Sequence, residues 1–471
     1  MKLSIMNIGA IDNAIVNIDG ITIIAGENNV GKSTIGKVLF AFLRNMSDWE
    51  KIYNRICDLS IGRYLYQNSV WLEDFCMKNS GAKRRRTSKS NQLITQYAND
   101  PDFRVALEDY QIHEESTNLE VAQNALDDQL KNYCLDYLTL YFAKSKGELF
   151  CAYKNELTAW ILRTSKDAAR LNLDEVELQK SAIKRSLEDV FKAQYRKIGT
   201  AKSEIIFTDE EDREVHFSSE DTGESLDNPI RIDNNIYFVE SPKIYDYIAN
   251  ARYGNNLRGY LRRMMVPNTF SIPITHSSNY TNKSVSTDDI GNDLKAILDH
   301  LSDIMGGQAE FLQKTGLMFK DRFLDVSINS ANVSTGLKSI ALLEYALRIG
   351  AIERGDILVL DEPEINLHPE WQLEYAKAIV ELQKNYGVKF IITSHSPFFM
   401  RAIECFTDVN GTMDDLNVYR VNRPNRADAC EVINVSYSEY GISELYEALS
   451  APLEKLDALL EEKYGAEDGD E

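Results

Sequence analysis

Short apolar runs dominate the start of the chain. Residues 3–8, 14–18 and 21–25 are rich in isoleucine and are separated by glycine, asparagine and aspartate. Apolar runs of this length between turn-forming residues predict β-strands. The next segment, residues 35–46, has apolar residues at a spacing of three and four, which predicts a helix. The chain therefore begins with a small β-meander followed by a helix.

The pattern becomes helix-like in the middle of the chain. From about residue 50 to residue 200 the apolar residues recur every three or four positions. Two strand-like runs then flank an acidic turn between residues 205 and 218, and residues 236–239 predict another strand. Residues 267–290 are rich in Ser, Thr and Asn, which predicts a linker. We therefore expect a mainly helical insertion over residues 51–289, with a small β-hairpin and a linker.

The last third returns to alternating strands and helices. Residues 293–305 predict a helix, residues 311–328 a hairpin, and residues 357–360 and 388–392 two buried strands. The predicted fold class is α/β, with a mixed sheet and a β-meander lobe. We expect a discontinuous main domain over residues 1–50 and 290–440. Residues 441–471 predict a C-terminal helical segment with an acidic tail, whose leucine stripe suits either a partner or the protein's own core.

A glycine-rich segment joins the third strand to the first helix. It has the spacing G-x4-G-K-[ST] of a phosphate-binding loop, whose backbone N–H groups and following helix N-terminus surround phosphates. We expect Lys32 to reach the β- and γ-phosphates and the Ser33 hydroxyl to bind Mg²⁺. The candidate nucleotide-binding residues of this loop are Gly26, Asn28, Asn29, Gly31, Lys32, Ser33 and Thr34.

Two carboxylates follow the buried strand at residues 357–360. The carboxyl ends of strands are where open α/β sheets bind ligands. We expect Asp361 to hold Mg²⁺ and Glu362 to polarise the attacking water. The next strand ends at Thr393-Ser-His395, so His395 is a candidate sensor of the γ-phosphate. The candidate catalytic residues are Glu362, His395 and Lys32, whereas His368 suits either packing or a role between subunits.

A further helix start has the features of an anion site. Ser334 and Gly336 precede or open the helix at residues 340–349. Helix capping by Ser334 would explain the serine by itself. A helix N-terminus of this kind also binds phosphate. Because the loop at residues 26–34 already serves this chain's own nucleotide, the second helix start suggests contact with a nucleotide held by another copy.

Composition narrows the class of protein. The formal net charge of −21 argues against a surface that coats DNA without specificity. No apolar stretch is long enough to span a membrane, and the six scattered cysteines fit reduced thiols, so we expect a cytoplasmic protein without a signal peptide or membrane contact. The basic run Lys83–Arg86 fits either a solvated loop or a contact to nucleic acid or to an acidic partner.

The order of these motifs resembles ABC-type ATPases of the RecF, SMC and OLD group. The resemblance covers roughly residues 1–50 and 290–420. It implies a P-loop ATPase head that uses ATP and Mg²⁺, and a homo-oligomer in which two heads enclose two ATP molecules. In such an assembly Ser334, Gly336 and Lys338 would complete the partner's site. The segment at residues 334–338 departs from the usual Leu-Ser-Gly-Gly-Gln form, and the Q-loop glutamine has no assigned position.

Two longer strings resemble stand-alone ATPases of bacterial anti-phage defence. They are residues 361–372, DEPEINLHPEWQ, and residues 393–398, TSHSPF. Residues 445–456 are also similar to the Septu ATPase PtuA. This resemblance implies a regulatory ATPase that controls a separate effector nuclease of the HNH type. The alternatives are an ATPase like AriA of the PARIS system, which has a Toprim effector, and a DNA-repair clamp like RecF.

Overall fold

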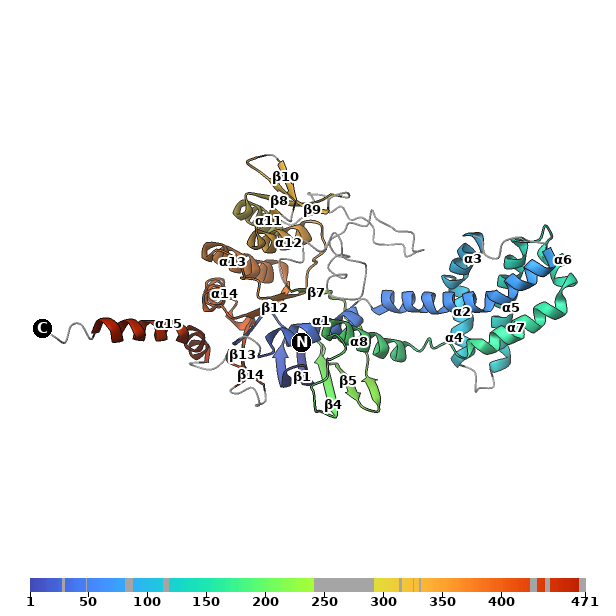
Figure 1. Ribbon diagram of the computed structural model, residues 1–471, viewed down its shortest axis with the longest axis horizontal. Coiled ribbons are helices and arrows are strands. Elements are labelled where there is room, and N and C mark those ends of the chain that lie inside the picture. The colour runs from blue at the N-terminus through green and yellow to red at the C-terminus, as the bar shows by residue number, and fades with distance from the viewer. Residues whose placement is uncertain are drawn as a thin grey trace. The chain divides into compact units, whose positions relative to one another are not determined.

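The computed structural model describes most of the chain (Figure 1). The described residues are 1–27, 30–47, 49–80, 88–112, 118–240, 292–312, 316–324, 326–329, 332–423, 430–436 and 441–465. The chain falls into two compact units. Among the described residues, the first unit takes those before residue 49 and those from residue 180 on, and the second takes those from 49 to 179.

One long mixed sheet forms the centre of the first unit. Among the described residues it has the strand order β6-β5-β4-β1-β2-β14-β13-β3-β12-β11-β7. The strands from β6 to β2 pair antiparallel as a meander, whereas β13, β3, β12, β11 and β7 run parallel. The predicted α/β class with a mixed sheet is therefore confirmed. The strands are β1 (Lys2–Ile8), β2 (Ile11–Asn17), β3 (Ile21–Ala25), β4 (Lys202–Thr208), β5 (Glu214–Glu220), β6 (Gly223–Asp227), β7 (Ile236–Val239), β11 (Ile357–Asp361), β12 (Lys389–Ser394), β13 (Leu416–Asn422) and β14 (Glu431–Asn434).

The antiparallel meander contains β4, β5 and β6 in addition to the strands at the start of the chain. Strand β4 pairs with β1, with Ile205 opposite Ile5, and β5 and β6 continue the sheet. Side chains in β4 and β5 alternate between buried and accessible, so one face of this hairpin covers the core. The unit boundary therefore falls near residue 179, not at the residue 289 expected from the sequence. The predicted linker over residues 267–290 lies outside the described residues.

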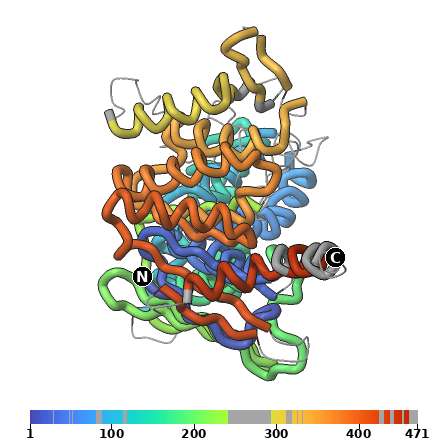
Figure 2. The backbone as a smooth tube through the Cα atoms, turned by 90° about the vertical axis from the view of Figure 1, so that its left-hand side faces the viewer, coloured from blue at the N-terminus to red at the C-terminus, as the bar shows by residue number. Residues whose placement is uncertain are grey.

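Helices of the first unit pack on the sheet and on one another. Helix α1 packs against β7, β11 and β12, and the helices from α11 to α14 pack side by side (Figure 2). A small antiparallel sheet precedes α12 in the chain and is formed by β8 (Gly307–Leu312), β9 (Gly316–Asp321) and β10 (Val326–Asn329). The helices are α1 (Lys32–Ser47), α8 (Glu175–Phe191), α11 (Asn292–Met305), α12 (Thr335–Arg348), α13 (Pro369–Tyr386), α14 (Pro397–Val409), the 3₁₀ turn η2 (Met413–Asp415) and α15 (Gly441–Gly465).

Helix α13 shows how local sequence sets the ends of an element. His368 adopts an extended conformation before the helix, and its Nδ1 accepts a hydrogen bond from the backbone N–H of Glu370. Pro369 then occupies the first helical turn, where its missing N–H costs nothing. Gly387 ends the helix at φ 68°, a left-handed conformation that favours glycine. The structure thus gives His368 a local capping role.

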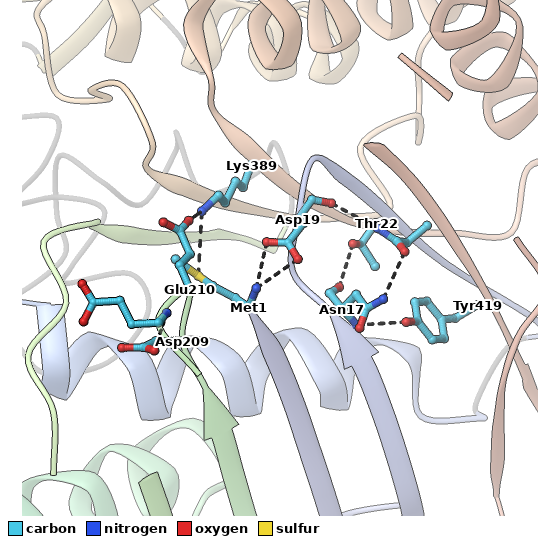
Figure 3. A network of polar contacts seen from close by, with 10 residues as sticks. Met1, Asn17, Asp19, Thr22, Asp209, Glu210, Lys389 and Tyr419 are labelled. Atoms are coloured by element: carbon cyan, nitrogen blue, oxygen red, sulfur yellow. Dashed lines mark hydrogen bonds and ion pairs between the residues drawn. The ribbon is translucent and has the colours of Figure 1, made fainter. Parts of the chain in front are cut away.

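Polar side chains fix the edge of the sheet where β3 and β12 begin (Figure 3). The Tyr419 hydroxyl accepts a hydrogen bond from the backbone N–H of Asn17 at 2.9 Å, and the Thr22 hydroxyl donates to the Asn17 carbonyl at 2.8 Å. Lys389 at the start of β12 pairs with Glu210 from the turn between β4 and β5. These contacts connect the meander to the parallel strands near the amino ends of β3 and β12.

The second unit is a helical bundle with its own core. Its helices are α2 (Trp49–Ser80), α3 (Ser88–Ala98), α4 (Pro101–Ile112), α5 (Leu119–Thr139), α6 (Lys146–Ala152), α7 (Lys154–Ala168) and the first turn of α8. Tyr133 lies at the centre, with its ring near those of Tyr97 and Trp160. The basic run Lys83–Arg86 lies outside the described residues. None of the helices in the described part of the chain is both long and apolar enough to cross a membrane.

Gly36 lets α1 approach the sheet closely. A Cβ atom at this position would lie 2.6 Å from Val359 Cγ1 and 3.2 Å from Phe238 Cε2. We predict that Gly36→Ala lowers the free energy of unfolding by about 1–3 kcal/mol because it overpacks this contact. Urea unfolding followed by circular dichroism measures the change.

Gly147→Ala is the matched control for this substitution. Gly147 is also a helical glycine, and nothing lies within 4 Å of a Cβ atom built on it. The control should be neutral or stabilising by about 0.5–1 kcal/mol, since alanine favours the helix more than glycine does. Equal effects of the two substitutions would contradict the close packing of α1.

Candidate nucleotide-binding site

The candidate site lies at the carboxyl ends of four neighbouring parallel strands. These strands are β7, β11, β12 and β3. Asp361 lies opposite Thr393, and Thr393 lies opposite Ile24. The loop that begins at Gly26 follows β3, and His395 follows β12. The parallel register therefore gathers segments from distant parts of the sequence at the edge where such sheets bind ligands.

Both glycines of the loop at residues 26–31 are required by its backbone. Gly26 has φ +154°, and a Cβ atom there would lie 2.4 Å from the carbonyl oxygen of Val421. Gly31 has φ +102°, and its Cβ atom would lie 2.9 Å from Ile11 Cδ1. Asn28 and Asn29, two further candidates of this loop, lie outside the described residues. The backbone thus lies close to β13 at Gly26 and close to β2 at Gly31.

Lys32 lies folded over its own loop. Its side chain is 5 % exposed, and Nζ donates hydrogen bonds to the carbonyl oxygens of Gly26 and Glu27, both at 2.8 Å. Burial lowers the pKa of Lys32, while the carboxylates of Glu362 and Asp361 oppose that shift by stabilising the charged amine. These two carbonyl oxygens thus hold the ammonium group beside the loop. Phosphate oxygens of a ligand could accept the same hydrogen bonds in their place.

Ser33 and Asp361 meet although 328 residues separate them. The Ser33 hydroxyl donates a hydrogen bond to Asp361 Oδ1 at 2.7 Å. The buried Thr393 hydroxyl donates to the same oxygen. Thr34, the remaining candidate of the loop, is half-buried, and its Cγ2 would lie 3.1 Å from a Cβ atom at Gly9, so its side chain packs below the turn between β1 and β2.

The pair of Ser33 and Asp361 fits a magnesium ion. Mg²⁺ prefers oxygen ligands and takes several of them from water and from substrate phosphates, so a protein needs to supply only one or two. A hydroxyl and a carboxylate oxygen within hydrogen-bond distance offer such a set. Among the described residues no cluster of three or more His, Cys, Asp or Glu side chains could hold a metal by itself.

Glu362 adopts an unusual backbone conformation. Its φ is 52°, in the left-handed region that residues other than glycine rarely adopt. Its backbone N–H donates to the carbonyl and hydroxyl oxygens of Thr393, at 3.0 and 3.1 Å. Strain of this kind is found where a side chain must point in a set direction. The turn directs the Glu362 carboxylate toward His395, whose Nδ1 lies 3.3 Å from Glu362 Oε1 without hydrogen-bond alignment.

A further carboxyl group, that of Glu364, lies in the same turn and was not predicted from the sequence. Glu364 is 4 % exposed, and its Oε1 accepts a hydrogen bond from the Ser394 hydroxyl at 2.5 Å. Its Oε2 is buried and has no hydrogen-bond partner among the described residues. Burial raises the pKa of Glu364, against the hydrogen bond from Ser394. In the sequence, Glu364 looks like a polar turn residue, because only the register of β12 brings Ser394 to it.

Glu240 is a second carboxylate that sequence reasoning missed. It follows β7 at the same edge of the sheet, and its Oε1 lies 3.5 Å from Lys37 Nζ on α1. A signal for it was present, because the strand predicted at residues 236–239 is followed directly by a carboxylate. Glu240 lies near the site only because β7 pairs with β11, and the sequence does not specify that pairing.

The predicted second phosphate contact lies at the start of α12. Ser334 is exposed and caps the helix, with its hydroxyl accepting a hydrogen bond from the Leu337 N–H. A Cβ atom at Gly336 would lie 2.4 Å from the Asn366 carbonyl oxygen, so close packing within the chain requires this glycine. Lys338 is 4 % exposed. Of the three candidates, only Ser334 is exposed in the single chain.

The comparisons with known proteins agree with this geometry. The chain matches the AAA ATPase domain family, AAA_15, over residues 1–400 and belongs to that family. It is also 26% identical over 163 residues to the "Retron Ec83 probable ATPase" of Escherichia coli. That match covers 31% of this chain and only 28% of the relative's length.

Three solved structures of SMC heads also match the chain at low similarity. The SMC head domain from Thermotoga maritima has 13% sequence identity and a TM-score of 0.36, covering 92% of this chain and 98% of that one. An SMC head bound to the C-terminal winged-helix domain of ScpA has 12% identity and a TM-score of 0.39, with 92% and 98% covered. An SMC head from Pyrococcus furiosus with an extended coiled coil has 14% identity and a TM-score of 0.30, with 98% of both chains covered.

We predict that Lys32→Ala weakens nucleotide binding roughly 10- to 100-fold, because a charge-assisted hydrogen bond to phosphate contributes about 1.5–3 kcal/mol. Equilibrium binding of a fluorescent ATP analogue with Mg²⁺ measures the affinity. Lys295→Ala, which removes an exposed lysine of α11, is the control and should bind as the wild type does. Equal affinities of wild type and Lys32→Ala would remove Lys32 from the site.

Proposed function

We propose that the chain binds ATP with Mg²⁺ at the carboxyl edge of β3, β12 and β11 and hydrolyses it, as an ABC-type head. The hydrogen bond of 2.7 Å between Ser33 and Asp361 carries this proposal. It joins the end of a glycine-rich loop to the carboxylate of a distant strand, which are the two groups that share a magnesium ion in P-loop enzymes. Membership of the AAA ATPase domain family supports the same activity.

Each residue of the site has a chemical task in this proposal. Ser33 and Asp361 would hold Mg²⁺, which neutralises charge on the phosphates. The Lys32 ammonium group would donate hydrogen bonds to phosphate oxygens in place of the loop carbonyl oxygens. Glu362 would orient the attacking water and accept its proton. His395 would contact the γ-phosphate, and its side chain, 41% exposed and 3.3 Å from Glu362, is accessible to a ligand.

The proposal extends to a pair of heads. Ser334 is exposed at the N-terminus of α12, where backbone N–H groups and the helix dipole favour an anion. We assign to Ser334 the contact with a nucleotide held by a second copy, and to Gly336 the close approach of α12 to the turn at Asn366 that this contact needs. A contact from the buried Lys338 would need a change of its side-chain conformation.

We further propose that the ATP state of the paired heads controls a separate effector nuclease in bacterial anti-phage defence. The resemblance of residues 361–372 and 393–398 to stand-alone defence ATPases supports this role. The relative named as a retron ATPase supports it as well. The proposed effector is of the HNH type, as for Septu ATPases, and a Toprim nuclease is the alternative.

We predict that Glu362→Gln lowers the rate of ATP hydrolysis roughly 10²- to 10⁴-fold, since loss of a general base has effects of this size. Nucleotide affinity should be retained, so ATP should accumulate on the variant and favour a dimer. Phosphate release and sedimentation velocity with ATP and Mg²⁺ measure the two effects.

Glu370→Gln is the matched control for this experiment. Glu370 is exposed on the first turn of α13, eight positions along the chain, and it should keep the wild-type rate. Wild-type turnover in Glu362→Gln would show that the catalytic assignment is wrong.

The effector role predicts a stable complex with the product of the adjacent reading frame. Co-expression from the native operon should recover an HNH or Toprim protein with this chain, and Glu362→Gln should change the nuclease activity of the purified complex. A nuclease whose activity is the same with wild type and with Glu362→Gln would rule out control by the ATP state. Recovery of no effector would contradict the regulatory role and leave the ATPase assignment standing.

A further inference from the structure

The Glu364 side chain joins the turn after β11 to the end of β12. Within the turn, the backbone N–H of Ile365 donates a hydrogen bond to the Glu362 carbonyl oxygen at 3.2 Å. The Glu364 carboxyl group then accepts a hydrogen bond from the Ser394 hydroxyl at 2.5 Å. This bond is formed one residue before His395 and two residues after Glu362. It therefore connects the two segments that carry the candidate catalytic pair.

The Ser394 end of this connection is fixed. Ser394 is fully buried at the end of β12, and its Oγ also accepts a hydrogen bond from the Ser396 N–H at 3.1 Å. The Ser396 hydroxyl caps α14 by accepting from the Phe399 N–H at 3.3 Å. His395 lies between these two serines in the chain. The backbone on both sides of His395 is thus held by hydrogen bonds.

Packing by itself does not account for a carboxyl group at position 364. Glu364 is 4 % exposed, and its Oε2 is buried without a hydrogen-bond partner in the described part of the chain. A buried polar atom without a partner lowers the free energy of unfolding, and a leucine in this place would avoid that cost. A carboxyl group here is explained if the site needs the hydrogen bond from Ser394.

The geometry of Glu362 and His395 needs such support. Glu362 has a left-handed φ of 52°, which a residue other than glycine keeps only when its surroundings hold it. Its Oε1 lies 3.3 Å from His395 Nδ1. The Glu364 carboxyl group acts electrostatically on both of these side chains. A loss of the bond to Ser394 would free the turn to move relative to His395.

We propose that Glu364 is a positioning residue for ATP hydrolysis, which sets the spacing of Glu362 and His395 through its hydrogen bond with Ser394. Glu364 does not touch the nucleotide in this role. A small misplacement of reacting groups lowers the rate of the chemical step strongly, even where binding is unchanged. The proposal rests on the proposed ATPase function and adds a residue that holds its catalytic groups in place.

Glu364→Leu tests this role, because it removes the hydrogen-bond acceptor and keeps an apolar side chain of similar size. We expect kcat to fall roughly 10- to 100-fold, with an affinity for a fluorescent ATP analogue and Mg²⁺ no weaker than that of the wild type. Glu370→Leu makes the same change on an exposed residue of α13 and should keep the wild-type kcat. Wild-type kcat in Glu364→Leu, or an affinity that weakens in step with kcat, would overturn the proposal.

The conservative variant Glu364→Gln separates the hydrogen bond from the charge. The amide oxygen of glutamine can accept the same bond from Ser394, whereas the negative charge is lost. We expect this variant to recover most of the rate, to within about threefold of the wild type. A kcat as low as that of Glu364→Leu would show that the charge matters and would contradict the proposed role.

Ser394→Ala removes the same hydrogen bond from its other end. It keeps the proposal testable if circular dichroism shows that Glu364→Leu does not fold. The double variant Glu364→Leu, Ser394→Ala should be no slower than the slower of the two single variants, since both substitutions remove one interaction. Effects on kcat that multiply in the double variant would mean that the two side chains act separately, and the proposal would be wrong.

Failure of this proposal can be told apart from failure of the proposed function. A wild-type chain that does not hydrolyse ATP would reject the ATPase function and the positioning role with it. An active wild type with full rates in Glu364→Leu and Ser394→Ala would reject the positioning role alone.

Discussion

The parallel register of β3, β12 and β11 is the constraint on which the site depends. It sets Ile24, Thr393 and Asp361 in one row across three strands. Strand β11 ends at this row and β3 and β12 end one residue beyond it, and the segments that follow carry Glu362, the glycine loop and His395. A shift of one residue in either pairing would turn Asp361 to the opposite face of the sheet. The buried apolar residues of β3, β11 and β12 resist such a shift, so the core of the first unit also specifies the chemistry at its edge.

Two buried hydroxyls join the end of β12 to the turn after β11. Thr393 donates to Asp361 and accepts from the N–H of Glu362, and Ser394 donates to Glu364. Ser394 Oγ also accepts from the N–H of Ser396, which caps α14. An apolar residue at position 394 would remove the hydrogen bonds to the buried Glu364 carboxyl group and from the N–H of Ser396, which is costly. The hydroxyls therefore hold the strained turn at Glu362 and connect it to the helix after β12.

The parts of the site that the sequence predicts are those carried by contiguous residues. The glycine loop, Ser33, and the Asp361-Glu362 pair after an apolar strand can all be recognised without knowing any pairing, and the structure brings Ser33 and Asp361 together. Glu364 could not be recognised, because its partner Ser394 is defined by the β11–β12 register. Residues 202–227 look like a separate hairpin in the sequence, and only the pairing of β4 with β1 makes them part of the main sheet. The fold class thus follows from local patterns, while the extent of the sheet depends on long-range pairing.

Several polar groups of the candidate site are hydrogen-bonded within the chain. Lys32 donates to two loop carbonyls, and Ser33 donates to Asp361. Glu362, Asp361 and Glu364 all act on Lys32, so carboxylates outnumber the ammonium group that they surround. A triphosphate adds more negative charge to this edge, which the backbone N–H groups of the loop and a metal ion must offset. If Asp361 holds Mg²⁺ as proposed, its contact with Ser33 would change, and the hydrogen bond from Thr393 to Asp361 would connect that change to β12, whose Ser394 accepts from the N–H of Ser396 at the cap of α14.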